Sequence, residues 1–114
     1  MRAIDLLVSR KPNAINLSLS GPANDLLNDA VARAGQAGIP LIAAAGNSGP
    51  RAKPLYPSAY DGVIAVTALD SKLNVYRRAR QGEHIDFAAP GVAIWTAASG
   101  KGIKQSTGTS FAAP

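Results

Sequence analysis

One apolar run, Ile39–Ala45, constrains the fold of this chain more than any other segment. A run of strand length with apolar residues at consecutive positions is typical of a strand buried on both faces of a parallel sheet. The residues from Asn24 to about Gly38 carry an apolar stripe at helical spacing, and Ala14–Ser18 reads as another short strand. Two strands joined by a crossover helix form a β-α-β unit. We therefore predict an α/β fold with a mostly parallel sheet.

Other segments extend this pattern without adding a second domain. Apolar residues recur at helical spacing over Ala3–Val8, and Pro12 disfavours helix at the residue before it, so a helix is predicted to end there. Further strands are predicted at Val63–Leu69, Ile85–Ala88 and Val92–Thr96. With 114 residues, 46% of them apolar and 17% charged, the chain is predicted to be globular and at most one small domain.

The charge pattern argues against a nucleic-acid partner. The net charge is +5, and Arg77, Arg78 and Arg80 cluster after Lys72 with Tyr76 as the only aromatic neighbour. Single-stranded nucleic acids are usually bound by basic residues together with several stacking aromatic side chains, and only 5% of this chain is aromatic. We predict a solvated loop here and no nucleic-acid partner.

Composition excludes two further classes. No stretch reaches the roughly 18 apolar residues of a membrane span, so no membrane partner is predicted. The chain has no cysteine, which excludes a disulfide scaffold and a Cys-based zinc site but leaves the compartment open.

Polar segments follow two of the predicted parallel strands. In an open α/β sheet ligands bind beyond the carboxyl ends of the strands, which points to Ser18-Leu19-Ser20 and Gly46-Asn47-Ser48-Gly49. The amide of Asn47 is one candidate for stabilising an oxyanion there. The other interpretation is an ordinary turn, because Gly-Asn-Ser-Gly is also what a loop uses for left-handed backbone angles.

Ser110 is the second candidate for chemistry, and it too has two interpretations. It stands between small residues where a loop is predicted to become a helix, in Gly108-Thr109-Ser110. A serine at a helix start gains backbone N–H groups and the positive end of the helix dipole as oxyanion stabilisers. Thr109 or Ser110 could equally serve as an N-cap. The segment lacks the second glycine of the α/β-hydrolase nucleophile elbow, which disfavours that fold.

Four segments in a fixed order carry a family resemblance over nearly the whole chain. They resemble the motifs of the subtilisin-like serine peptidases (subtilases), and they are Asn16–Pro22, Ala43–Gly49, Ala88–Gly91 and Gly108–Pro114. The resemblance implies an incomplete subtilisin-like three-layer fold. Residues 1-114 would then be a partial catalytic domain, its C-terminal half, without the upstream half that carries the aspartate and histidine and without the rest of the helix after Ser110.

The resemblance also implies site residues. Ser110 would be the nucleophile, and Asn47 together with the Ser110 backbone N–H would form the oxyanion hole. The pocket for the substrate residue before the cut would lie between two walls, and the first wall would pair with the substrate backbone as an added strand. These walls are Ser18, Leu19 and Ser20 on one side and Ala44, Ala45 and Gly46 on the other.

The chain departs from the family pattern at several positions. Family members usually have glycine where this chain has Ser20, which predicts a narrower pocket edge, and Phe111 stands where methionine is frequent. Leu55-Tyr56-Pro57 resembles the segment that flanks the pocket; the resemblance favours a cis Tyr56–Pro57 bond, although about 94% of X-Pro bonds are trans.

The largest departure concerns the catalytic base. No Asp-Ser-Gly, Asp-Thr-Gly or His-Gly-Thr motif occurs, and the only histidine is His84. His84 and Asp86 are predicted to share one face of a peripheral strand away from Ser110, so we expect a structural or solvent-facing role for His84. A serine without a base remains a protonated alcohol, and these 114 residues alone are expected not to hydrolyse peptides.

Two functions from different classes remain open. One is a fragment of a serine endopeptidase that acts on a peptide or protein substrate, and the other is a non-catalytic subtilase-like peptide-binding module. No cofactor or metal is predicted for this chain, while the family often uses calcium for stability in the full-length parent. The resemblance favours a secreted or periplasmic parent. Sheet faces without their covering elements predict self-association of the fragment.

Overall fold

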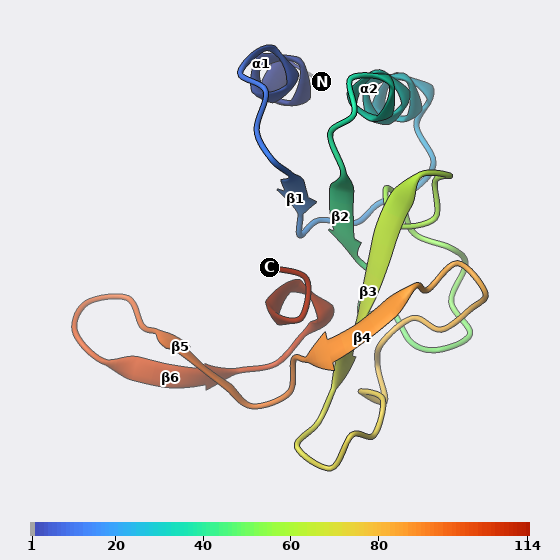
Figure 1. The fold of residues 1–114 in the computed structure, drawn as a ribbon. Coiled ribbons are helices and arrows are strands. Elements are labelled where there is room, and N and C mark those ends of the chain that lie inside the picture. Colours follow the sequence, from blue (N-terminus) through green and yellow to red (C-terminus); the bar gives the residue numbers. More distant parts are fainter. Residues whose placement is uncertain (1) are drawn as a thin grey trace.

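A parallel sheet forms the centre of the molecule in the computed structural model, which describes residues 2–114 (Figure 1). Four strands lie side by side in sequence order and all run parallel: β1 (Ile15–Leu17), β2 (Leu41–Ala44), β3 (Val63–Leu69) and β4 (Phe87–Pro90). The register pairs Leu17 with Ala43 and Ala44 with Val66. The carboxyl ends of β1 and β2 therefore lie together, and the predicted α/β fold is confirmed.

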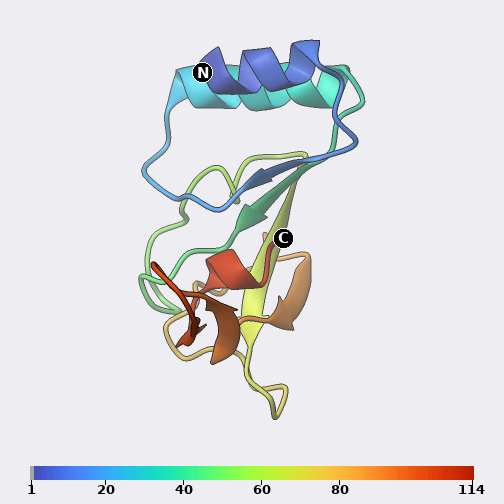
Figure 2. The same ribbon diagram turned by 90° about the vertical axis from the view of Figure 1, so that its left-hand side faces the viewer.

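Two helices lie along one side of this sheet. They are α1 (Arg2–Ser9) and α2 (Asp25–Gln36), which lie side by side in both views (Figures 1 and 2). The predicted second helix begins where Asn24 caps it: the Asn24 Oδ1 accepts a hydrogen bond from the Leu27 N–H at 3.0 Å. After its end the chain turns at Gly38, whose φ of 73° lies in the left-handed region that glycine adopts without strain.

Alternate residues of the central strands pack into two different apolar clusters. Leu41 and Ala43 pack with Val31 and the other residues beneath the helices, whereas Ala44 and Val66 pack with the C-terminal residues Ala112 and Ala113. Successive side chains of a strand point to opposite faces, so the central strands β2 and β3 are covered on both sides. This arrangement of helices, sheet and C-terminal segment is the incomplete three-layer fold that the sequence predicted.

The last strand of the sheet begins two residues later than predicted. We expected a strand at Ile85–Ala88, and β4 begins at Phe87. The reason lies at Asp86, whose Oδ2 accepts the Ala65 N–H at 2.8 Å, so that a side chain replaces the first hydrogen bond of the ladder. The strand extends to Pro90, a residue that an edge strand tolerates because no neighbour needs its N–H.

A hairpin extends away from the central sheet, as Figure 1 shows. It consists of β5 (Ile94–Ala97), shifted from the predicted Val92–Thr96, and an antiparallel strand β6 (Ile103–Ser106) that the sequence analysis missed. The sequence of β6 contains only one apolar residue, so it shows no strand pattern. Within the described part of the chain no helix is long and apolar enough to span a membrane.

Candidate active site

The structure brings Ser110 to the carboxyl end of β1. Ser110 lies in a short 3-10 helix, η1 (Thr109–Phe111), which is all that is present of the helix predicted to begin here. The Ser110 hydroxyl donates to the Ser18 carbonyl oxygen at 3.5 Å, and the Ser18 hydroxyl donates to the Ser110 carbonyl oxygen at 3.4 Å. Both bonds are long and therefore weak. They show that the two segments lie next to each other, but they restrain the Ser110 hydroxyl only slightly.

Thr109 ties the same short helix to the end of β2. Its side chain is fully buried, and its Oγ1 accepts the Gly46 N–H at 3.1 Å. Its own backbone N–H donates to the Asn47 Oδ1 at 3.0 Å. The sequence analysis considered Thr109 only as a helix cap and missed this role; its only signal was its position beside Ser110.

The hydrogen bond from Thr109 sets the direction of the Asn47 carboxamide. Because Oδ1 accepts a bond, the Nδ2 end of the half-buried side chain is left as a donor, and among residues 2–114 it has no acceptor. The N–H of Ser110 likewise has no acceptor within this part of the chain. Two unused donors therefore come from segments that contact each other, which is the composition of an oxyanion hole.

Both alternative interpretations can now be judged from the geometry. The turn predicted around Asn47 exists, since Gly46 and Gly49 have φ angles of 96° and 105°, but Asn47 also uses its side chain to bind Thr109. The N-cap interpretation is wrong: Gly108 occupies the N-cap position of η1, and no side chain caps it.

Gly91 and Gly108 pack closely together just before Ser110. A Cβ on Gly91 would lie 2.7 Å from the Ala68 Cβ and 2.9 Å from the Gly108 carbonyl oxygen, which leaves no room for a side chain. The Gly108 N–H in turn donates to the Gly91 carbonyl oxygen at 2.8 Å. A Cβ on Gly108 would lie 3.4 Å from the Asn47 Nδ2. The absence of side chains at Gly91 and Gly108 thus allows the loop to approach the Asn47 amide.

Arg78 and Arg80 of the basic cluster form hydrogen bonds with the turn around Asn47. The Arg80 N–H donates to the Gly46 carbonyl oxygen at 2.9 Å, and the Gly49 N–H donates to the Arg78 carbonyl oxygen at 2.8 Å. The Arg80 guanidinium also donates to the Pro50 carbonyl oxygen at 2.8 Å. Arg77 and Arg78 are exposed as predicted, but Arg80 is half-buried, so the solvated-loop prediction is wrong for that residue.

The two predicted pocket walls lie at the ends of neighbouring strands. Ser18, Leu19 and Ser20 follow β1 and are exposed, whereas Ala44, Ala45 and Gly46 at the end of β2 are buried. The first wall continues into Gly21, which pairs with Tyr56 through two backbone hydrogen bonds of 2.9 and 3.0 Å. The Tyr56–Pro57 bond is cis, as the resemblance favoured.

His84 lies in a different place from the other candidate residues. It is in a turn before β4 rather than on the predicted strand, and with Gly62, Val63 and Asp86 it lines a small cavity of about 170 Å³. That cavity adjoins the amino end of β3, whereas Ser18 and Asn47 follow the carboxyl ends of their strands. Burial, and then the charge of Arg80, lower the pKa of His84 below its ordinary 6.5, against the opposing effect of Asp86.

No metal site is evident around these residues. In the region covered by the structure, residues 2–114, no three side chains of His, Cys, Asp or Glu gather in a way that could hold a metal ion.

The comparison with protein families settles which group this arrangement belongs to. The model of the subtilase family (Peptidase_S8) matches residues 1–114. The chain belongs to the subtilase family. It is 34% identical over 116 residues to the minor extracellular protease Epr of Bacillus subtilis. The aligned region covers 100% of this chain but 18% of Epr. It is 39% identical over 106 residues to subtilisin DY of Bacillus licheniformis, covering 90% of this chain and 39% of the relative.

Solved subtilase structures share the fold. The prenylagaramide maturation protease PagA superimposes with a TM-score of 0.90 at 31% identity, over 98% of this chain and 43% of PagA. The chain thus spans less than half the length of each of these relatives. The family match covers residues 1–114.

Proposed function

We propose that these residues form the nucleophile-bearing part of a serine endopeptidase, with Ser110 as nucleophile and Asn47 as oxyanion donor. The observation that carries the proposal is the bond from the Thr109 N–H to the Asn47 Oδ1, because it leaves the Asn47 Nδ2 as a donor on a segment tied to the residue next to Ser110. Among residues 2–114 the Ser110 N–H also has no acceptor. Membership in the subtilase family supports hydrolysis of peptide bonds by the parent.

The proposed reaction follows the usual course of acyl transfer. The Ser110 Oγ attacks the carbonyl carbon of the peptide bond, and its proton passes to a base. The carbonyl oxygen becomes an oxyanion, which accepts hydrogen bonds from Asn47 and from the Ser110 N–H. The protonated base then gives the proton to the leaving amine, and water hydrolyses the acyl-enzyme.

The base is not among the residues near Ser110. By family resemblance it is a histidine oriented by an aspartate, both upstream of the segment seen here. His84, the only histidine, lines a cavity at the other end of β3. We therefore propose that these 114 residues alone hydrolyse no peptide. The same observation favours the second candidate function, a peptide-binding module without catalysis.

A chimera tests both functions. The parts of subtilisin DY that lie before and after the matched segment are joined to the two ends of this chain, the first of which by resemblance carries the aspartate and histidine, and hydrolysis of a chromogenic peptide is measured. We expect activity in the chimera and none in the chain alone. Ser110→Ala should lower turnover by about 10⁶-fold and Asn47→Ala by about 10²–10³-fold, magnitudes taken from subtilisin itself.

The matched control is Ser48→Ala, which removes an exposed hydroxyl next to Asn47 and should leave turnover unchanged. A folded chimera that binds the peptide but does not cleave it would support the binding module. Cleavage that Ser110→Ala does not reduce would contradict the proposed nucleophile.

We also propose that the isolated chain self-associates. Large apolar side chains are exposed on β4 and on the hairpin, with Phe87, Trp95 and Ile103 between 63% and 71% accessible. Exposed apolar surface of this kind favours association. Light scattering over a range of concentrations should show oligomers, and Trp95→Lys should reduce them. A compact monomer at every concentration would contradict this proposal.

A further inference from the structure

The basic residues of this chain are concentrated in two segments beside the turn around Asn47. Half of its Lys and Arg residues lie within residues 46–60 and 71–82, and none of its Asp or Glu residues does. Like charges that gather without opposite charges among them repel one another and destabilise the folded state. A partner of opposite charge would remove this repulsion.

Hydrogen bonds hold the two basic segments together. The Gly49 N–H donates to the Arg78 carbonyl oxygen at 2.8 Å. The Arg80 guanidinium donates through Nη1 to the Pro50 carbonyl oxygen, also at 2.8 Å, and Arg51 is the next residue of that segment. We call Arg51, Arg78 and Arg80 the basic surface.

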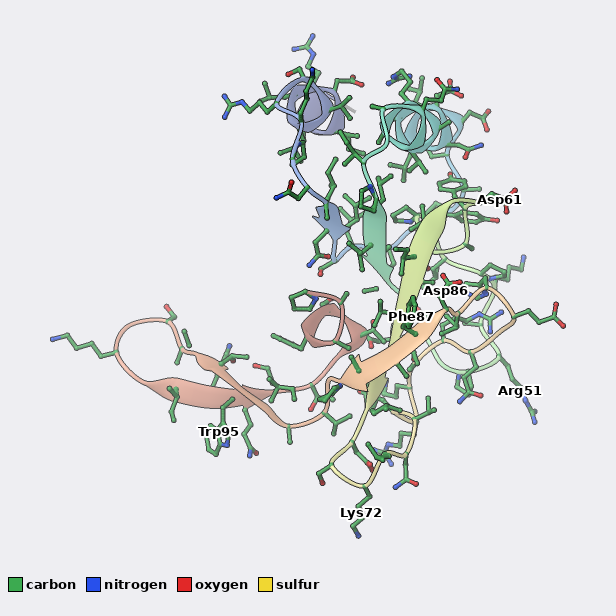
Figure 3. All side chains as sticks on the ribbon, viewed as in Figure 1. Arg51, Asp61, Lys72, Asp86, Phe87 and Trp95 are labelled. Carbon is green, nitrogen blue, oxygen red and sulfur yellow. The ribbon has the colours of Figure 1, made fainter. Side chains whose placement is uncertain are left out.

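The guanidinium groups of the basic surface form no ion pair with a carboxylate of the described chain. Among residues 2–114 the only ion pair joins Arg33 to Asp5, on the two helices. Arg51 and Arg78 are exposed, and Figure 3 shows Arg51 pointing outward from the loop that carries it. Arg80 is half-buried. Partial burial reduces screening by water, so the charge of Arg80 acts more strongly on neighbouring groups.

The surroundings of the basic surface favour an acidic peptide over a nucleic acid. Guanidinium groups bind carboxylates and phosphates alike, but single-stranded nucleic acids also need aromatic side chains on which bases stack. The aromatic residue nearest in sequence, Tyr76, is half-buried against the apolar cluster of the C-terminal residues. The Arg80 N–H donates to the Gly46 carbonyl oxygen at 2.9 Å, so the basic surface adjoins the turn that carries Asn47.

From this arrangement we propose that the basic surface binds an acidic segment of the peptide substrate beside the Asn47 turn. Glutamate or aspartate side chains pair with Arg51 and Arg78, and the charge of Arg80 adds to the attraction. Exposed ion pairs contribute little each, so the surface selects among substrates and does not hold them alone. The inference rests on the proposed function, because it takes the peptide beside Asn47 to be a substrate.

Peptide binding tests this inference without requiring a catalytic base. Two octapeptides, identical except that two glutamates in the first are glutamines in the second, are titrated into the 114-residue chain, and Kd is measured by calorimetry. At about 50 mM NaCl the glutamate peptide should bind about 5-fold or more tightly than the glutamine peptide. At about 500 mM NaCl the difference should fall to about 2-fold or less, because salt screens exposed charges.

Two substitutions locate the effect on the basic surface. Arg51→Gln and Arg78→Gln should each reduce the preference for the glutamate peptide by about 2–5-fold, and together they should abolish it. Arg78→Gln retains the backbone carbonyl that binds Gly49, so the turn keeps this contact. The matched control, Arg10→Gln, removes the same charge at an exposed position just after α1 and should leave the preference unchanged.

The outcomes separate this proposal from its alternatives. Equal binding of the two peptides, no binding of either, or a preference that Arg10→Gln reduces as much as Arg51→Gln and Arg78→Gln would overturn it. A single-stranded oligonucleotide of equal charge that binds more tightly than the glutamate peptide, and only while Arg51 and Arg78 are present, would overturn it in favour of a nucleic acid. An inactive chimera beside an intact preference for glutamate would overturn the peptidase and leave the basic surface standing.

Discussion

The central sheet with its strand-end site and the β5–β6 hairpin are built in opposite ways. In the sheet and at the site, Leu41, Ala45 and Thr109 are at most 1% exposed, and a buried hydrogen bond joins Gly46 to Thr109, far apart in sequence. On the hairpin, Trp95 and Ile103 are more than 60% exposed. Their strands, β5 and β6, pair with each other as a separate two-stranded sheet. Figure 3 shows Trp95 pointing away from the central sheet. The candidate site and the hairpin thus differ in how many long-range contacts hold their residues in place.

The largest expected effect is on stability, from one truncation in each region. Leu41→Ala removes a buried side chain of β2 and should lower the free energy of unfolding by about 2–5 kcal/mol. Ile103→Ala makes a comparable truncation on β6, where the side chain is 71% exposed, and should change it by less than about 0.5 kcal/mol. Urea unfolding followed by circular dichroism measures both. Equal losses would show that the hairpin is as well packed as the sheet.

A smaller effect is expected from two buried threonines. Thr109→Val leaves the buried Gly46 N–H without its acceptor and should cost about 1–3 kcal/mol. Thr67→Val is the matched control: the Thr67 hydroxyl is buried and has no partner among the residues described, so its removal should be neutral or stabilising. The same unfolding experiment compares them. If Thr67→Val lowered the free energy of unfolding as much as Thr109→Val, the loss could not be assigned to the hydrogen bond between Thr109 and Gly46.

The smallest effect concerns pH. Because the pKa of His84 is lower in the folded chain than its ordinary 6.5, the unfolded chain takes up the proton first as the pH falls. The contribution of His84 to the free energy of unfolding should therefore be greatest above pH 6.5. It should decrease as the pH falls below 6.5 and become constant below the folded-state pKa. His84→Gln should remove this component. Unfolding curves from about pH 8 to about pH 5 would contradict the prediction if both chains changed alike.

The sequence predicted those helices and strands whose apolar residues are spaced according to which of their faces are buried. The run Ile39–Ala45 marked a central strand, and the stripe after Asn24 marked the helix, since both patterns follow directly from two-sided or one-sided burial. β6 could not be found in this way because its residues are exposed and polar.

The sequence could single out candidate residues for the site but not the contacts between them. Asn47 and Ser110 were singled out from their small neighbours and their place in the chain, and the structure brings their segments together. The bond from Thr109 to Asn47 joins residues 62 positions apart, and the packing of Gly91 against Ala68 depends on strand register. Neither leaves a periodic signal, so local pattern could not reveal them.

The bond between Thr109 and Asn47 has an engineering consequence. Under the proposed function, it makes the mutual orientation of the proposed nucleophile, Ser110, and the proposed donor, Asn47, a property of one contiguous polypeptide, because the bond comes from the residue next to Ser110. A second polypeptide bringing histidine and aspartate would need only to dock; it would not have to assemble the donors. The chain is therefore suited to serve as one half of a split-protein reporter, in which peptide cleavage appears only when two separately expressed pieces meet.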